Sequence, residues 1–100
     1  MMDNYERQQF EDAHDNNIRL FNEAEQIIND YRREANQKTS QLVDYVSSFY
    51  QNLPDGVPRN LSFQFEEKFN EYDRVLKKKE EELEVARDEE RRDFNQKMEW

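Results

Sequence analysis

The sequence predicts an all-α protein made of two long antiparallel helices. Both prolines and the only glycine lie within residues 53–58, so one short break divides the chain. On either side of this break, apolar residues recur at alternating spacings of three and four, which is typical of helices that pack along a seam. Charged residues make up 39% of the chain, a composition typical of long or coiled helices. We therefore expect residues 1–100 to form a single helical-hairpin domain with coiled-coil-like packing.

The first helix is expected over residues 3–53. Asp3 and Glu6 have the spacing of a capping box, in which an acceptor at the helix start is followed three residues later by a glutamate. A heptad seam then follows, with Lys38 as its polar interruption, and we expect it to pack against the second helix. Traced backwards, it reaches Asn17, His14 and Phe10 and becomes more polar. Its members are Phe21, Ala24, Ile28, Tyr31, Ala35, Lys38, Leu42, Tyr45 and Phe49.

The turn is expected over residues 54–60, with Pro54, Asp55, Gly56 and Pro58 as its characteristic residues. Pro54 ends the first helix because proline lacks an amide proton and clashes with the preceding helical turn. Gly56 can take a positive φ without steric cost, and Asp-Gly is common in turns. Pro58 suits the approach to a second helix, for which we expect Asn60 or Ser62 to act as the cap.

The second helix is expected over residues 61–97. Its seam repeats the same spacing until Glu90 and Asp93 interrupt it, and Phe94 and Met98 indicate that the stripe drifts around the helix. We interpret the charged run at residues 77–93 as a solvated helix face. The members of the seam are Phe65, Phe69, Tyr72, Leu76, Lys79, Leu83 and Ala86.

A further set of apolar residues lies off both seams. It can be an unusually broad core face or a second contact surface, and we favour the second because a two-helix hairpin has only one internal seam. These residues are therefore predicted to bind a helical partner and to complete a four-helix bundle with it. They are Ile18, Ile27, Val43, Val46, Tyr50, Phe63, Val75 and Val85.

The residue inventory argues against an enzyme. With no cysteine, one histidine and one glycine, the chain offers no Cys/His pair, no Ser/His/Asp arrangement and no glycine-rich phosphate loop. Glu11-x-x-His14 has the spacing used in di-iron helical bundles, but only a homodimer could supply the second motif. We interpret His14 as a half-exposed histidine near a helix end, and we expect no metal and no cofactor.

Charge and hydropathy also restrict the partners and the location. The net charge of −9 argues against nucleic acid and anionic membrane surfaces, since both select a basic surface. No apolar run approaches the roughly twenty residues needed to span a bilayer. The N-terminal residues lack the basic and apolar regions of a signal peptide. We expect a cytoplasmic protein, or one that is exported without a signal peptide.

Phe69-x-x-x-Asp73 has the aromatic-x-x-x-acid form of an export signal used by some small helical secreted proteins. Three of the twelve Phe and Tyr residues have an acid four positions later. Because about a quarter of the residues are acidic, chance alone predicts about three such matches. The motif is therefore a weak indication of export.

The layout resembles the small helical hairpins of bacterial type VII secretion, the Trp-X-Gly family and its relatives. The turn Pro54-Asp55-Gly56 matches the family's glycine but lacks its tryptophan, and Phe49 and Tyr50 could fill the apolar role before the turn. The chain is more similar to the LXG-associated helical proteins of Gram-positive bacteria. One branch of these proteins has a second helix rich in Lys-Glu runs, similar to residues 65–69 and 76–83.

This resemblance implies a targeting factor or chaperone for an LXG toxin. Such a protein binds the helical N-terminal domain of the toxin, a second small hairpin protein, or both, and aids export of the toxin. The alternative is a structural coiled-coil or scaffold protein that associates with itself, for instance as a homodimer. Weak self-association is expected of the adaptor, and a stable homodimer or larger assembly is expected of the scaffold.

Overall fold

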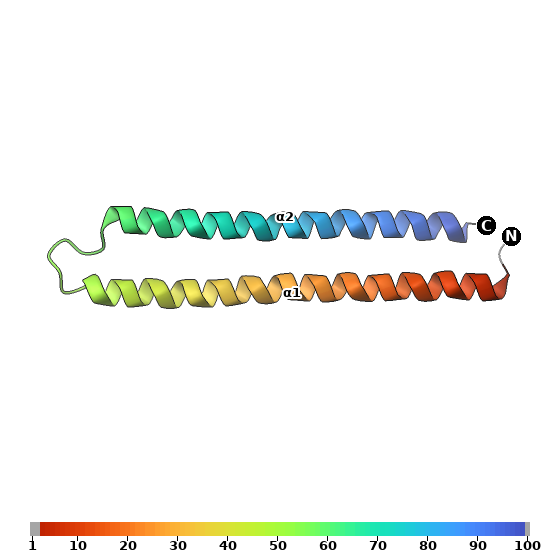
Figure 1. Cartoon of the computed structure of the whole chain (residues 1–100), viewed down its shortest axis with the longest axis horizontal. Coiled ribbons are helices and arrows are strands. Elements are labelled where there is room, and N and C mark those ends of the chain that lie inside the picture. The colour runs from red at the N-terminus through yellow and green to blue at the C-terminus, as the bar shows by residue number, and fades with distance from the viewer. Residues whose placement is uncertain (1–2, 100) are drawn as a thin grey trace. The chain divides into compact units, whose positions relative to one another are not determined.

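The computed structural model describes residues 3–99 and contains two α-helices, α1 (Asn4–Tyr50) and α2 (Arg59–Met98) (Figure 1). No β-strand occurs in this described part of the chain. The predicted all-α class and the helical hairpin are therefore confirmed.

The start of α1 is capped as expected. The Glu6 backbone amide donates a hydrogen bond to Asp3 Oδ1 at 2.7 Å, which satisfies one of the free donors of the first turn. At its other end α1 stops at Tyr50, three residues before the expected boundary. There the Leu53 amide donates to the Tyr50 carbonyl at 3.0 Å, and the Gly56 amide donates to the Leu53 carbonyl at 3.2 Å. These two tight turns replace the last turn of the expected helix.

The connection also fixes the start of α2. Gly56 has a φ of 63°, the left-handed conformation that was predicted for it. The Pro58 carbonyl accepts hydrogen bonds from the amides of Leu61 and Ser62, at 3.1 and 3.2 Å, and α2 begins at Arg59. The expectation that Asn60 or Ser62 caps this helix is wrong, because both lie inside its first turn and Pro58 already occupies the position before it.

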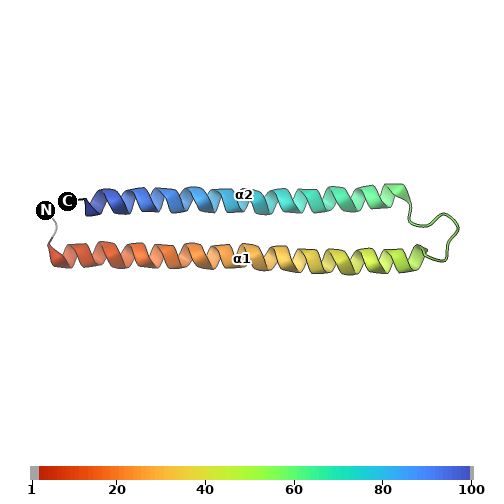
Figure 2. The same cartoon turned by 180° about the vertical axis from the view of Figure 1, so that it is seen from behind.

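The chain forms two compact units, each of which pairs a segment of α1 with a segment of α2. The turn unit comprises Asn29–Lys78 and includes the connection. The terminal unit comprises the residues up to Ile28 together with those from Lys79 onward. In the turn unit the two helix segments run side by side and antiparallel on either side of the connection, as the two opposite views show (Figures 1 and 2).

In the terminal unit the contact face follows most of the predicted seam. Every predicted seam position on its α1 segment is half-buried, including the more polar Asn17 and His14. Its α2 segment half-buries Leu83 and Ala86, but Glu80 is half-buried in place of the expected Lys79. Glu90, which the sequence suggested would interrupt the seam, is half-buried and contacts α1.

In the turn unit the face of α1 that contacts α2 is displaced by about one residue from the predicted seam. The half-buried positions are Arg32, Ala35, Thr39, Val46 and Tyr50, whereas the expected seam residues other than Ala35 are exposed. On α2, Leu76 is the only buried side chain among the described residues, with 7% of its surface exposed. A straight helix has 3.6 residues per turn, so it drifts relative to a strict heptad by roughly one residue position over about five heptads. The expected internal seam is therefore turned toward solvent here.

Candidate helix-binding surface

Three large apolar side chains of α1 lie exposed on one face of the turn unit. Leu42, Tyr45 and Phe49 are spaced by three and four residues, so they share one side of the helix. Their exposed fractions are 44%, 72% and 63%. We call these three residues the open stripe. They have the spacing with which one helix packs against another.

The face of α1 that packs against α2 adjoins the open stripe. Val46 and Tyr50 are half-buried, so the helix that carries the stripe is anchored through the adjacent face. The Phe49 ring meets the Tyr50 ring edge to face, with centroids 5.0 Å apart and planes at 82°. This contact links an exposed aromatic ring to a half-buried one.

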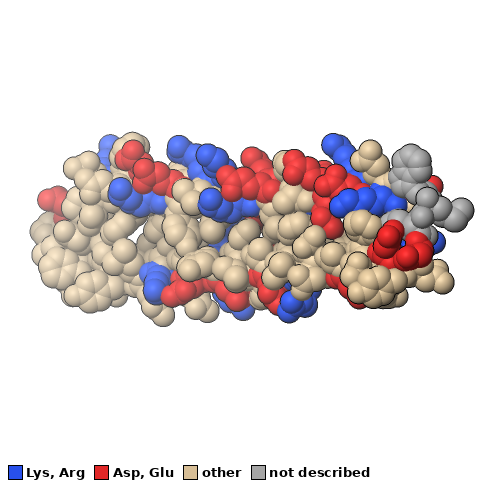
Figure 3. Space-filling view, turned by 45° about the vertical axis from the view of Figure 1, so that its right-hand side comes forward, with Lys and Arg blue, Asp and Glu red and all other residues tan. Residues whose placement is uncertain are grey.

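The surroundings of the open stripe carry little charge. Among residues 39–65 only Asp44, Asp55 and Arg59 are charged, although 39% of the whole chain is charged. Nine of the thirteen large apolar side chains that the structure shows exposed belong to the turn unit. In Figure 3 the surface next to the connection is accordingly mostly free of acidic and basic side chains. Contiguous apolar surface of this kind marks interaction sites in proteins.

The charge of the chain is divided unequally between the two units. The turn unit contains eight basic and eight acidic residues and is neutral. The remaining residues contain seven basic and sixteen acidic ones, and they account for the whole net charge of −9. The exposed apolar surface and the excess negative charge therefore lie in different units.

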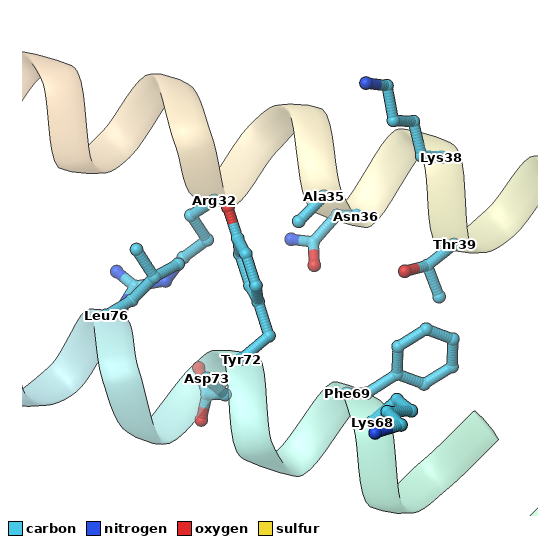
Figure 4. Close-up of a pocket in the computed structure, with 10 residues that line it drawn as sticks. All are labelled: Arg32, Ala35, Asn36, Lys38, Thr39, Lys68, Phe69, Tyr72, Asp73 and Leu76. Carbon is cyan, nitrogen blue, oxygen red and sulfur yellow. The ribbon is translucent and has the colours of Figure 1, made fainter. Parts of the chain in front are cut away.

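A groove of about 270 Å³ lies between the helices of the turn unit (Figure 4). Phe69 and Tyr72 extend from α2 toward α1, and Arg32 extends from α1 toward α2. Both residues of the weak export motif, Phe69 and Asp73, are among those that line it. The lining residues are Arg32, Ala35, Asn36, Lys38, Thr39, Lys68, Phe69, Tyr72, Asp73 and Leu76.

Three charged groups of this groove are paired within their own helices. Lys38 Nζ lies 2.8 Å from the Glu34 carboxylate, which raises the pKa of Lys38, first through the hydrogen bond and then through Coulomb attraction. Lys68 Nζ lies 3.5 Å from Glu71, and Asp73 lies 3.1 Å from Lys77 Nζ. Exposed pairs of this kind are weak and are screened by solvent. The groove thus combines an apolar floor with a polar rim, which suits it to receive a side chain of a neighbouring helix.

A second groove of about 200 Å³ lies next to the connection. Val43 and Val46 contribute to its wall from α1, and Phe65 and Phe69 contribute from α2. Val57 of the connection also lines it. This groove brings two of the predicted partner-binding residues together, although Val46 is mostly engaged within the helix pair.

The predicted partner-binding residues fall into two groups. Ile27, Val43, Phe63, Val75 and Val85 are exposed, as a contact surface requires. Ile18, Val46 and Tyr50 are half-buried instead, and the last two lie on the face of α1 that contacts α2. The sequence interpretation missed the open stripe because it assigned those residues to the internal seam. The sequence nevertheless contained the signal for this face, because Leu42, Tyr45 and Phe49 have the heptad spacing of a helix-binding surface.

In the terminal unit, polar side chains join the two helices. The His14 ring stacks on Phe94, with centroids 3.9 Å apart and planes at 14°, and His14 Nδ1 lies 3.1 Å from Glu90 Oε1. With an ionised Glu90, Nδ1 of His14 donates this hydrogen bond, because an ionised carboxylate only accepts. Arg87 donates to Glu25 at 2.7 Å and to Asn22 at 3.0 Å. These contacts hold the two helix segments of this unit in one register.

The geometry gives the Glu11-x-x-His14 motif a structural role. Glu11 pairs with Arg7 at 3.5 Å, and His14 is engaged with Glu90 and Phe94. No group of three or more potential metal ligands gathers anywhere in residues 3–99. Over the same residues, neither helix contains a segment that is long and apolar enough to cross a membrane.

No protein family, curated protein or solved structure matches this chain.

Proposed function

We propose that this chain is a non-catalytic adaptor that binds a helix of another protein on the open stripe. The observation that carries this proposal is the exposure of Leu42, Tyr45 and Phe49 on one helix face within a neutral, charge-poor unit. Burial of such side chains stabilises a complex by roughly 1.5–3 kcal/mol for each one that is fully buried. A helix is the expected occupant because alternating three and four spacing matches the ridges of another helix.

The adjoining grooves add specificity to this surface. Tyr31 and Tyr72 line a third hollow together with Ala35 and Lys38, so the apolar surface of α1 continues onto α2. A partner helix that lies along this side of the turn unit can place its side chains in these hollows. Docking a helical hairpin here would complete a four-helix bundle.

The resemblance to LXG-associated proteins suggests what the partner is. On that basis the partner is the helical N-terminal domain of an LXG toxin, with or without a second small hairpin protein. The chain then acts as a targeting factor in a Gram-positive bacterium. It meets the toxin in the cytoplasm and either remains there or is exported with it without a signal peptide.

Calorimetric titration of the chain with the purified N-terminal domain of a toxin encoded beside its gene tests this proposal. Tyr45→Glu is expected to weaken binding about tenfold or more, because interface tyrosines often contribute more than 1.4 kcal/mol. Ser40→Glu is the matched control, because it adds the same charge to an exposed site on the opposite side of α1. Equal loss in both variants, or no binding by the wild-type chain, contradicts the proposal.

A second candidate is a scaffold protein that assembles with itself. Phe63 and Val75 of α2 are 63% and 56% exposed and lie outside the open stripe, so further faces are open to contact. A scaffold that uses several faces would form assemblies that grow with concentration. The adaptor proposal predicts no growth beyond a small complex, so a concentration series separates the two.

A further inference from the structure

We infer that in the free protein the open stripe of one chain packs against the open stripe of a second copy, in a weak dimer. The dimer follows from the surface itself. In this dimer the second copy covers the open stripe until a partner helix displaces it, and this role of the dimer rests on the proposed function.

The division of charge directs self-association to the turn unit. Two copies that meet through their turn units bring together two neutral surfaces. Contact through the terminal units would oppose two net charges of −9. Like charges that face each other across an interface oppose association. The neutral unit is therefore the part of the chain on which a second copy can dock.

The face that carries the open stripe also avoids local charge conflict. Between residues 39 and 50 of α1 the only charged residue is Asp44, which the helical period places away from Leu42 and Phe49. A second copy therefore buries the stripe without burying a carboxylate. A buried unpaired charge would be strongly unfavourable.

The spacing of the stripe is self-complementary under a twofold axis. If the two α1 helices pack antiparallel about an axis near Tyr45, this residue lies opposite Tyr45 of the second copy. Leu42 of each chain then lies opposite Phe49 of the other, so a smaller side chain faces a larger one. Such an interface uses the same patch on both chains and closes at two copies.

The dimer is expected to be weak, because each chain contributes only three stripe residues and their immediate neighbours. Small interfaces of this kind belong to transient complexes. We expect a dissociation constant on the order of 1–100 µM. A helical partner that also fills the grooves makes more contacts and can displace the second copy.

Sedimentation equilibrium of the full chain over a range of concentrations tests the dimer. The mass is expected to rise from 12.4 kDa toward twice that value and to stop there. Tyr45→Glu is expected to remain monomeric, and Ser40→Glu is expected to dimerise like the wild type. Circular dichroism should show equal helicity in all three chains, because both sites are exposed.

Each other outcome overturns the inference. A wild-type chain that is monomeric at every concentration, or a Tyr45→Glu variant that still dimerises, excludes this interface. Growth beyond two copies excludes the closed dimer and favours a scaffold. The adaptor proposal is tested separately by titration with the toxin domain, so a monomer that binds the toxin refutes only the dimer. A dimer that does not bind the toxin refutes only the adaptor.

Discussion

Leu76→Ala tests whether the helices of the turn unit pack as described. Leu76 of α2 lines the groove together with Arg32 of α1, and only 7% of Leu76 is exposed. The substitution removes about three methylene equivalents, at roughly 0.8 kcal/mol each. The groove is open to solvent, so little additional cavity penalty is expected. We therefore expect the free energy of unfolding to fall by about 2–3 kcal/mol.

The assay is urea unfolding followed by circular dichroism, with thermal unfolding as a second measure. A loss of about 2–3 kcal/mol corresponds to a fall in Tm of roughly 10–20 °C for a domain of this size. Val75→Ala is the matched control on the same helix, because Val75 is 56% exposed. The higher helix propensity of alanine offsets part of its lost contact, so its effect should stay within about 0.5 kcal/mol. Equal effects of the two substitutions would refute the assigned faces of α2.

Three further substitutions probe the connection and the terminal unit. Gly56→Ala should lower the free energy of unfolding by about 1–2 kcal/mol in a urea titration. The new Cβ meets no atom within 4 Å, so the cost comes from the φ of 63°, which disfavours alanine. Gly56→Asn should cost less, and equal costs would contradict the left-handed turn. His14→Ala should lower the free energy of unfolding by about 1–2 kcal/mol in the same assay, since it removes both the stacking on Phe94 and the partner of Glu90. His14→Phe should recover part of this loss. If His14→Ala left the stability unchanged, the interhelical contact would be excluded. Arg87→Ala should lower the free energy of unfolding by about 1 kcal/mol. This loss should be smaller at high salt, because the partner Glu25 is half exposed. A double-mutant cycle with Glu25→Ala that shows no coupling energy would exclude the ion pair.

The helices and the connection could be predicted from the sequence because their signals are local. Pro54, Gly56 and Pro58 act on their own backbone and that of immediate neighbours, and so does the Asp3 cap. The boundaries were less certain, since the turn after Tyr50 and the cap role of the Pro58 carbonyl depend on backbone hydrogen bonds that leave no residue signature. Local chemistry therefore predicts the elements better than their ends.

The open stripe could not be predicted, because a small error in helical period changes which face is internal. A strict heptad places Tyr45 and Phe49 against α2, whereas the structure places Val46 and Tyr50 there. Both sets of residues are apolar, so the hydrophobic pattern cannot distinguish them. The sequence analysis interpreted the broad stripe as more apolar surface than one partner helix can cover. The structure leaves several of these residues exposed, but the inner and outer residues were partly exchanged.

The contacts between His14 and Glu90 and between Arg87 and Glu25 were missed for a different reason. They join residues more than sixty positions apart, so they depend on the register of the helix pair. Glu90 and Arg87 lie within a run of charge that favours a solvated face, and most of its residues are indeed exposed. Only the three-dimensional pairing shows which of them reach the other helix.

The most direct test of the open stripe compares the thiol reactivity of two adjacent positions. The chain has no cysteine, so Tyr45→Cys and Val46→Cys each introduce a single reporter. At concentrations where sedimentation shows monomers, Tyr45→Cys should react with a maleimide at the rate of an unfolded peptide, and Val46→Cys should react several-fold more slowly. Faster reaction of Val46→Cys would contradict the assignment, because it would return Tyr45 to the internal face and remove the proposed helix-binding surface.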